Sequence, residues 1–224
     1  MTRPIRSYVL RQGRITAAQE RALRELFPRY GLDFSGKEIS PRKTFNREAP
    51  LVLEIGSGMG ETTAAIAKAN PDVNFLAVEV HAPGVGALLN RIESERLANL
   101  RVIRHDAAEV LQAMIPDASL AAIHLFFPDP WPKKRHHKRR LVQPAFAALC
   151  ARKLAPGGLF HAATDWPEYA DQIGAVLSGN SDFEIVNESK GERRETKFEK
   201  RGLKLGHSVR DLRFRRRETA PAAR

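Results

Sequence analysis

Short apolar runs alternate with stretches of helical periodicity from residue 51 onward. Five of these runs predict β-strands, at 51–56, 74–80, 100–106, 120–127 and 159–165. The stretches that follow them predict α-helices, at 61–70, 83–97, 108–115, 141–154 and 167–179. Near-continuous apolar strands that alternate with helices are typical of a parallel sheet covered on both faces. The pattern therefore predicts a doubly wound α/β domain whose ligands gather at the carboxyl ends of the strands.

The segments on either side of this pattern are less regular. Residues 1–50 are Arg-rich, contain scattered Gly and Pro, and predict a basic, partly flexible extension with one helix near 16–26. Residues 183–186 predict a sixth strand. Residues 208–217 alternate in polarity and predict an antiparallel edge strand, with a disordered basic tail as the alternative.

The positive charge of the chain is segregated. The formal net charge is +11, and residues 1–19, 133–140 and 190–217 carry +4, +6 and +8, which leaves −7 for the rest. Basic charge confined to a few segments favours a polyanion as partner, because phosphate contacts release bound counterions. The alternative is a generally basic, well-solvated surface.

The cysteine and hydropathy content point to the cytoplasm. Cys150 is the only cysteine, so an intrachain disulfide is excluded, and its apolar neighbours predict a core position. No apolar run approaches the length of a membrane span, and no signal-peptide segment is recognisable. We expect a cytoplasmic protein without a membrane partner.

Three glycines follow the first predicted strand in "LEIGSGMGE", at Gly56, Gly58 and Gly60. Glycines at this point allow the backbone to approach a ligand closely at a helix N-terminus. A dinucleotide site requires the spacing G-x-G-x-x-G, and here the third glycine comes one residue early. The spacing therefore disfavours an NAD-dependent oxidoreductase.

Four successive strands place a carboxylate at or near the ligand edge: Glu54, Glu79, Asp106 and Asp129. A carboxylate after the second strand suits a ribose, because it accepts hydrogen bonds from both hydroxyls. An anionic pocket is unsuited to a pyrophosphate but suits a ligand that carries an ammonium and a sulfonium. That ligand is S-adenosylmethionine. Taken singly, each of the four acids is also compatible with a solvated strand end.

The motifs "LEIGSGMG", "AVEV", "RHDA" and "FFPDPWPKKRHHKRR" together resemble the tRNA guanine-N7 methyltransferases, the TrmB family. The resemblance continues through "HAATDWPEY" and "ETKFEKRG" and covers about residues 50–202. It implies a Rossmann-like class I S-adenosylmethionine-dependent methyltransferase that forms 7-methylguanosine in tRNA, at a guanosine in the variable loop. The expected methyltransferase domain spans 51–217, followed by a disordered tail over 218–224.

The resemblance also implies the site residues. Asp129 is expected to be the catalytic acid and to contact the methyl donor together with Glu54, Glu79, Asp106 and the three loop glycines. The residues expected to bind the substrate are Lys133, Asp165, Thr196, Lys197, Phe198 and Glu199. The residues expected to contact RNA are Arg135, His136, His137, Lys138, Arg139 and Arg140.

The chemistry of the residues agrees with these roles. Pro128 and Pro130 restrict the backbone on both sides of Asp129 and so limit the entropy lost in holding its carboxylate still. Guanine N7 carries an in-plane lone pair and attacks a methyl group without a general base, so positioning and electrostatics remain for the protein. We therefore interpret Asp129 as a hydrogen-bond acceptor or charge stabiliser, with Asp165 as a second contact to guanine.

Trp131 and the adjacent His136 and His137 each have a structural interpretation beside a functional one. Trp131 is compatible with stacking on an RNA base, but packing against the sheet edge is favoured. His136 and His137 are adjacent and diverge on any regular element, so we expect no metal site.

Other function classes stay open at this stage. A methyltransferase acting on another RNA, a protein or a small molecule would explain the glycines and acids but not the three basic segments. A non-enzymatic RNA-binding protein would need a damaged donor pocket. The sequence leaves monomer and homodimer undecided.

Overall fold

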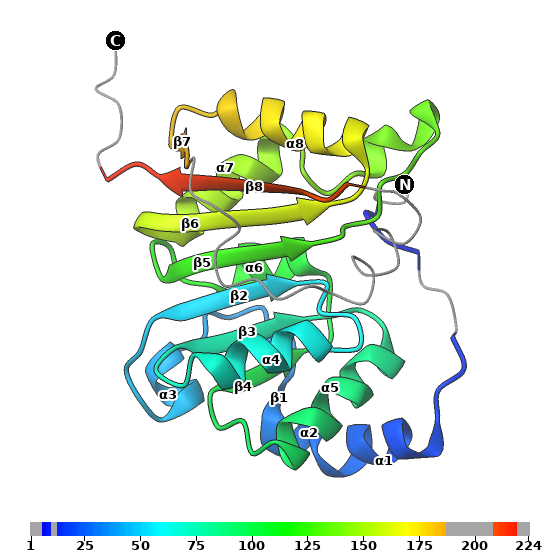
Figure 1. Ribbon diagram of the computed structural model, residues 1–224. Helices are drawn as coiled ribbons and strands as arrows, with labels where there is room; N and C mark the ends of the chain where they lie inside the picture. Colours follow the sequence, from blue (N-terminus) through cyan, green and yellow to red (C-terminus); the bar gives the residue numbers. More distant parts are fainter. Residues whose placement is uncertain (1–5, 10–12, 187–207, 219–224) are drawn as a thin grey trace.

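The computed structural model describes residues 6–9, 13–186 and 208–218, and their strands form one eight-stranded sheet (Figure 1). The strands are β1 (Gly31–Leu32), β2 (Leu51–Ile55), β3 (Asn74–Val78), β4 (Leu100–Ile103), β5 (Leu120–Phe126), β6 (Leu154–Thr164), β7 (Phe183–Ile185) and β8 (Arg210–Arg216). Their order is β1-β4-β3-β2-β5-β6-β8-β7. The pairs from β1 to β6 are parallel, whereas β8 is antiparallel to both β6 and β7.

Helices cover both faces of the sheet, as the apolar pattern predicts. They are α1 (Ala17–Glu25), α2 (Phe27–Tyr30), α3 (Pro41–Phe45), α4 (Glu61–Ala69), α5 (Ala82–Ser94), α6 (Ala107–Met114), α7 (Pro144–Lys153) and α8 (Pro167–Ser178), with a 3₁₀ helix η1 over Lys134–Arg139. In Figure 1, α4 and α5 lie in front of the sheet and α6 lies behind it. The prediction of a doubly wound α/β domain is confirmed.

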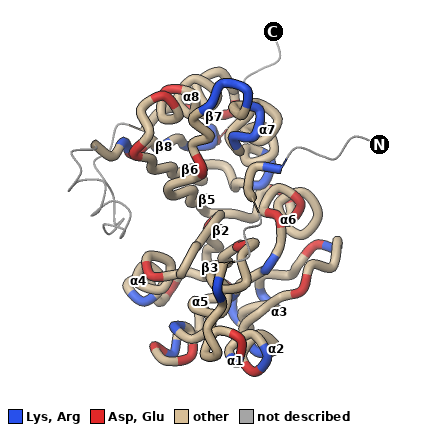
Figure 2. Tube along the Cα trace, turned by 90° about the vertical axis from the view of Figure 1, so that its right-hand side faces the viewer, with Lys and Arg blue, Asp and Glu red and all other residues tan. Residues whose placement is uncertain are grey.

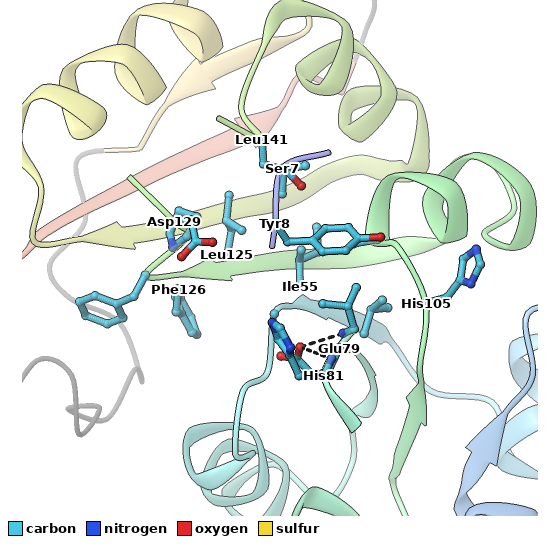
Figure 3. A pocket seen from close by; sticks show the side chains of 16 residues that line it. Ser7, Tyr8, Ile55, Glu79, His81, His105, Leu125, Phe126, Asp129 and Leu141 are labelled. Atoms are coloured by element: carbon cyan, nitrogen blue, oxygen red, sulfur yellow. Dashed lines mark hydrogen bonds between the residues drawn. The ribbon is translucent and has the colours of Figure 1, made fainter. Parts of the chain in front are cut away.

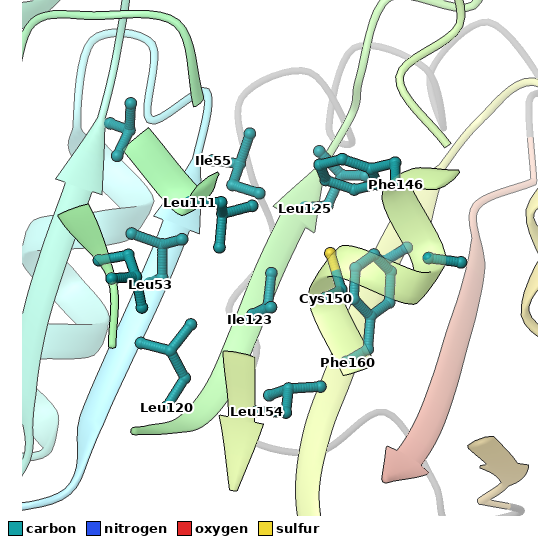
Figure 4. Close-up of a cluster of buried hydrophobic side chains, with 14 of the residues drawn as sticks. Leu53, Ile55, Leu111, Leu120, Ile123, Leu125, Phe146, Cys150, Leu154 and Phe160 are labelled. Atoms are coloured by element: carbon teal, nitrogen blue, oxygen red, sulfur yellow. The ribbon is translucent and has the colours of Figure 1, made fainter. Parts of the chain in front are cut away.

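Two apolar cores follow from this arrangement, one on each face. One core packs α6, α7 and α8 against the sheet and includes the fully buried Phe160 and Tyr169 (Figure 4). The other packs α1, α4 and α5 against the opposite face through residues such as Val85 and Leu88. Cys150 lies in the first core, and its burial raises the pKa of the thiol, so the expected core role is confirmed.

The N-terminal region is more ordered than its composition predicts. Thr16 and Gln19 form a capping box that begins α1, and Ala22 of that helix is buried in the second core. Gly31 and Leu32 pair with β4 and thereby extend the sheet at one edge. These contacts place part of the region before residue 51 in the same sheet and core as the rest, and the helix predicted near 16–26 is confirmed as α1.

The strand near the C-terminus was predicted at the sheet edge, and this placement is corrected. β8 lies between β6 and β7, with hydrogen-bonded neighbours on both sides. Phe214 on β8 is 3% exposed and belongs to the first core, which holds the strand in the interior of the sheet. The alternative of a disordered tail does not apply to residues 210–216.

Candidate functional site at the strand ends

The strands β2, β3 and β5 end at one edge of the sheet, and a cavity lies there (Figure 3). We call it the strand-end cavity; its wall includes Gly56 after β2, Glu79 and His81 after β3, and Asp129 after β5. This is the point where the strand order reverses between β2 and β5. Crevices at such a switch point are the usual ligand sites of open α/β sheets.

A second hollow, the outer groove, adjoins the cavity. Its wall includes Met59, Pro83 and Gly84 on one side and the segment 130–133 on the other. The cavity and the groove share three wall residues, Glu79, His81 and Asp129. The carboxylates of Glu79 and Asp129 therefore stand where two ligands, one in each hollow, would approach one another.

The loop of three glycines connects β2 to α4, and each glycine has a positive φ: 76° at Gly56, 55° at Gly58 and 74° at Gly60. A Cβ atom at Gly56 or Gly58 would meet nothing within 4 Å, so the backbone is open to a ligand at both positions. At Gly60 a Cβ atom would lie 2.5 Å from the Leu88 side chain. Gly60 therefore serves the packing of α4 on α5.

Glu79 fixes the shape of the cavity wall. Its carboxylate accepts hydrogen bonds from the backbone N–H groups of Gly58 (2.8 Å), Val80 (2.7 Å) and His81 (2.9 Å), two of which are drawn in Figure 3. A carboxylate offers about four acceptor positions, so one remains after these three bonds. Glu79 thus ties the glycine loop to the end of β3, and its expected contact with a ribose stays a prediction.

Glu54 lies beneath the glycine loop on β2 and is 4% exposed. Burial raises the pKa of its carboxyl to about 7, with the nearby Thr63 hydroxyl acting in the opposite direction. One carboxyl oxygen, Oε2, has no hydrogen-bond partner among the residues described. A buried acceptor without a partner is costly. Glu54 is not a wall residue of the strand-end cavity or the outer groove, so this oxygen does not open onto either hollow.

Asp106 and Asp165 follow β4 and β6 but are not wall residues of either hollow. Asp106 is the N-cap of α6, and its side chain accepts from Ala108 N at 2.8 Å and Glu109 N at 3.2 Å. Its neighbours His105 and Ala107 do line the cavity. Asp165 follows the end of β6 directly, so both acids remain near the ligand edge.

The loop after β5 carries Asp129 in a strained conformation. Phe127 has a φ of 53° and Trp131 a φ of 45°, so two large residues adopt left-handed backbone on either side of Asp129. Each such residue costs about 1–3 kcal/mol and persists only where the surroundings enforce it. The loop is therefore held in place against its own preference, with the Asp129 carboxylate in the wall of both hollows.

The N-terminal segment 6–9 lies across this loop, which the sequence did not indicate. The indole of Trp131 donates to the Ser7 carbonyl at 3.0 Å, and Arg139 donates to the carbonyls of Arg6 at 3.1 Å and Tyr8 at 3.3 Å. Ser7 and Tyr8 line the strand-end cavity as a result (Figure 3). Trp131 is also a wall residue of the outer groove, with the Arg139 guanidinium 4.0 Å from its ring centroid, so packing against the sheet edge and stacking on a base both stay predictions.

The basic run 133–140 separates into exposed and enclosed cations. Its Lys and Arg gather in the upper part of Figure 2, beside α7 and α8. The side chains of Lys133, Lys134, Arg135 and Lys138 are exposed, whereas Arg139 is partly covered. The Arg140 side chain is only 1% exposed. This burial sets Arg140 apart from the exposed cations of the run, and the RNA contacts expected of residues 135 to 140 stay a prediction.

Further sequence predictions concern the basic segment near the C-terminus and metal binding. Thr196, Lys197, Phe198 and Glu199 lie outside the described residues. Within the described ranges, no three His, Cys, Asp or Glu side chains are grouped so as to hold a metal ion. No described helix is long and apolar enough to cross a membrane.

Comparison with known proteins agrees with this geometry. A family model described as "Putative methyltransferase" matches residues 48–212. The chain is 53% identical to the tRNA (guanine-N(7)-)-methyltransferase of Nitrosospira multiformis over 222 residues, covering 97% of both chains. It is 54% identical to the protein of that name from Nitrosomonas europaea, covering 95% of this chain and 97% of that one. The chain belongs to the tRNA (guanine-N7-)-methyltransferase family.

Two solved structures with a similar fold are methyltransferases of low sequence identity to this chain. The 16S rRNA methyltransferase KamB matches with a TM-score of 0.57 at 16% identity, covering 81% of this chain and 95% of that chain. The aminoglycoside resistance methyltransferase NpmB1 matches with a TM-score of 0.53 at 14% identity, covering 80% and 94%. The fold is therefore the Rossmann-like fold of class I S-adenosylmethionine-dependent methyltransferases, as predicted.

Proposed function

We propose that this protein transfers a methyl group from S-adenosylmethionine to N7 of a guanosine in tRNA and so forms 7-methylguanosine. The observation that carries the proposal is the position of Asp129, whose side chain lies in the wall of both the strand-end cavity and the outer groove. The methyl donor belongs in the cavity, and the guanine belongs in the groove. Asp129 then stands at the boundary where the methyl group passes from one to the other.

The strand-end cavity fits the donor. Open space at Gly56, in the cavity wall, lets a ligand lie against the backbone, and Glu79 retains one acceptor position for a ribose hydroxyl. We also propose Glu54 as a donor contact on the resemblance of its motif to the family, although its side chain is buried and lies outside the cavity wall. When bound, S-adenosylmethionine supplies an activated methyl group. The chain's own residues orient it and exclude water.

We assign Asp129 to positioning and electrostatics, because N7 of guanine carries no proton at neutral pH and needs no general base. A carboxylate at the boundary where the methyl group passes stabilises the positive charge that methylation creates at N7. Lys133 lines the groove and is exposed, so its ammonium is available to the substrate. The proposed substrate contacts further include Asp165 and the segment 196–199.

Exposed cations beside the groove support a tRNA substrate. Lys134, Arg135 and Lys138 follow Lys133 on η1 and are exposed, which suits contacts to the phosphates that flank the methylated guanosine. We further propose a guanosine of the variable loop as the target, a cytoplasmic location, and a monomer or homodimer as the working form.

A nucleoside analysis tests the proposal. The purified protein is incubated with labelled S-adenosylmethionine and bulk tRNA, with ribosomal RNA in a parallel reaction, and the RNA is digested to nucleosides. We expect label in 7-methylguanosine from tRNA and none from ribosomal RNA. Label in a different nucleoside, or from ribosomal RNA alone, would refute the assignment.

A further inference from the structure

Arg140 is the enclosed member of a run whose other basic residues lie at or near the surface. Its side chain is 1% exposed, whereas Lys133, Lys134, Arg135 and Lys138 are exposed. Arginine is rarely buried unless each face of its guanidinium finds a partner. The contacts of Arg140 therefore indicate the role of its positive charge.

The guanidinium of Arg140 bridges the Asp129 loop and helix α8. Its Nε donates to the carbonyl of Pro130 at 2.8 Å, and its Nη1 donates to Oε1 of Gln172 at 2.7 Å. The group lies 5.0 Å from the ring centroid of Tyr169, and its Nη2 is 3.6 Å from Oε1 of Glu168. Three of these partners are on α8, and the fourth directly follows Asp129 in the chain.

The partners of Arg140 are themselves fixed. Gln172 donates through Nε2 to the carbonyl of Val142 at 3.0 Å, and the Tyr169 hydroxyl accepts from Val142 N at 3.2 Å. Tyr169 is fully buried in the core. The bridge is therefore anchored in the rigid part of the fold, and only the Asp129 loop would move if it were cut.

That loop requires such an anchor. Phe127 and Trp131 hold left-handed backbone on either side of Asp129, and a strained conformation relaxes unless its surroundings enforce it. The bond from Arg140 to the Pro130 carbonyl lies inside the strained segment. A hydrogen bond from a charged donor is stronger than one between neutral groups, which suits this restraint.

We propose that Arg140 is a positioning residue that holds the Asp129 carboxylate in place in the wall shared by the two hollows, and that it makes no contact with RNA. The inference rests on the proposed function, since the position of this carboxylate matters for methyl transfer to guanine. It separates the run 133–140 into exposed cations that bind tRNA and one buried cation that supports the site.

The substitution Arg140→Lys separates the two roles. Lysine keeps the positive charge but has a single nitrogen in place of the planar fork, so it does not reproduce the separate bonds from Nε to Pro130 and from Nη1 to Gln172. A displacement of the carboxylate by about 1 Å lowers the rate by up to about a hundredfold. We expect kcat to fall by about tenfold to a hundredfold, with tRNA affinity and the salt dependence of binding unchanged.

If Arg140 instead bound a phosphate of the tRNA, the expected results would be the opposite. In that case Arg140→Lys would keep kcat, and Arg140→Gln would weaken tRNA binding and flatten its salt dependence by about 0.7 for each phosphate that the protein no longer neutralises. Either result would overturn the proposal. Lys138→Gln, which removes an exposed charge from the same run, is the matched comparison and should change affinity and salt slope.

A second variant guards against loss of folding. Gln172→Leu leaves Arg140 in place and removes one acceptor of the bridge, so kcat should fall here too. The melting temperature should drop, because a buried donor loses its partner, but stay well above the assay temperature, so that the variant is assayed in the folded state. The double variant Arg140→Lys with Gln172→Leu should show a smaller decrease than the product of the single effects. Fully multiplicative effects would refute a shared bridge. Failure of the wild type to form 7-methylguanosine would instead refute the proposed function.

Discussion

The indole Nε1 of Trp131 donates a hydrogen bond of 3.0 Å to the carbonyl oxygen of Ser7, although 124 positions separate the two residues in the chain. The bond joins the loop that carries Asp129 to a segment near the N-terminus. Through it, Ser7 and Tyr8 become part of the wall of the strand-end cavity. The donor pocket is therefore closed by a segment that lies outside the parallel sheet.

Trp131→Phe removes this donor and keeps an aromatic ring for Arg139. We expect affinity for S-adenosylmethionine to fall by about three- to tenfold, because one hydrogen bond contributes roughly 0.5–1.5 kcal/mol and its loss releases Ser7 and Tyr8 from the cavity. Isothermal calorimetry measures the change. Trp166→Phe, the same substitution at the start of α8, is the control and should leave donor affinity as it is. Equal affinities for wild type and Trp131→Phe would contradict the role of segment 6–9.

Asp129→Asn should abolish methyl transfer while the fold is retained. The side chain keeps its size but loses the negative charge that stabilises the methylated guanine, and it lies in the cavity wall outside both apolar cores. Turnover is measured with labelled S-adenosylmethionine, and the melting temperature reports on the fold. Asp72→Asn, in the exposed turn between α4 and β3, should behave as wild type. Near-normal turnover of Asp129→Asn would remove Asp129 from the mechanism.

Replacing Lys134, Arg135 and Lys138 by Gln should weaken tRNA binding and flatten its salt dependence. If each exposed cation contacts one phosphate, the slope changes by about 0.7 per phosphate, or about 2 in total. Filter binding at several salt concentrations gives both quantities, and donor affinity should not change. The matched control neutralises the exposed Lys37, Arg42 and Lys43. Arg42 and Lys43 are on α3, which lies away from the ligand edge (Figure 1). An identical effect of both triple variants would indicate nonspecific attraction by the net charge.

Glu54 should make the free protein less stable as pH rises. Burial raises the pKa of its carboxyl to about 7 from an ordinary value of 4.5, so the folded state binds the proton more tightly than the unfolded state. Stability is then highest below pH 4.5 as far as this group is concerned, and it declines as pH rises through 4.5 to 7. The total decline is about 3 kcal/mol, since a difference of one in pKa corresponds to about 1.4 kcal/mol.

Glu54→Gln tests this expectation. Urea unfolding at pH 5 and pH 8 should show a smaller loss of stability for the variant than for the wild type over that range. Glu25→Gln, on the exposed face of α1, is the control and should follow the wild type. Parallel pH profiles for wild type and Glu54→Gln would mean that Glu54 is ionised in the folded protein.

The sequence by itself determined the layered fold and the edge at which the site lies. Apolar runs of strand length, separated by helical periodicity, admit few arrangements other than a parallel sheet between helices, and the carboxyl ends of parallel strands share one edge. The sequence also located the glycine loop and the acids after successive strands, because each is a local feature at the end of a predicted strand. The motif from Phe126 to Arg140 was specific enough to indicate the family.

Only the tertiary structure decided which of these residues face the ligand space. Asp106 caps α6 and Gly60 packs against Leu88, although the linear pattern groups them with Asp129 and Gly56. Arg140 turns inward because α8 supplies its acceptor Gln172, 32 positions further along the chain. Contacts between segments distant in the chain leave no periodic signal in either one. The burial of Arg140 and the hydrogen bond between Trp131 and Ser7 are therefore apparent only in the folded structure.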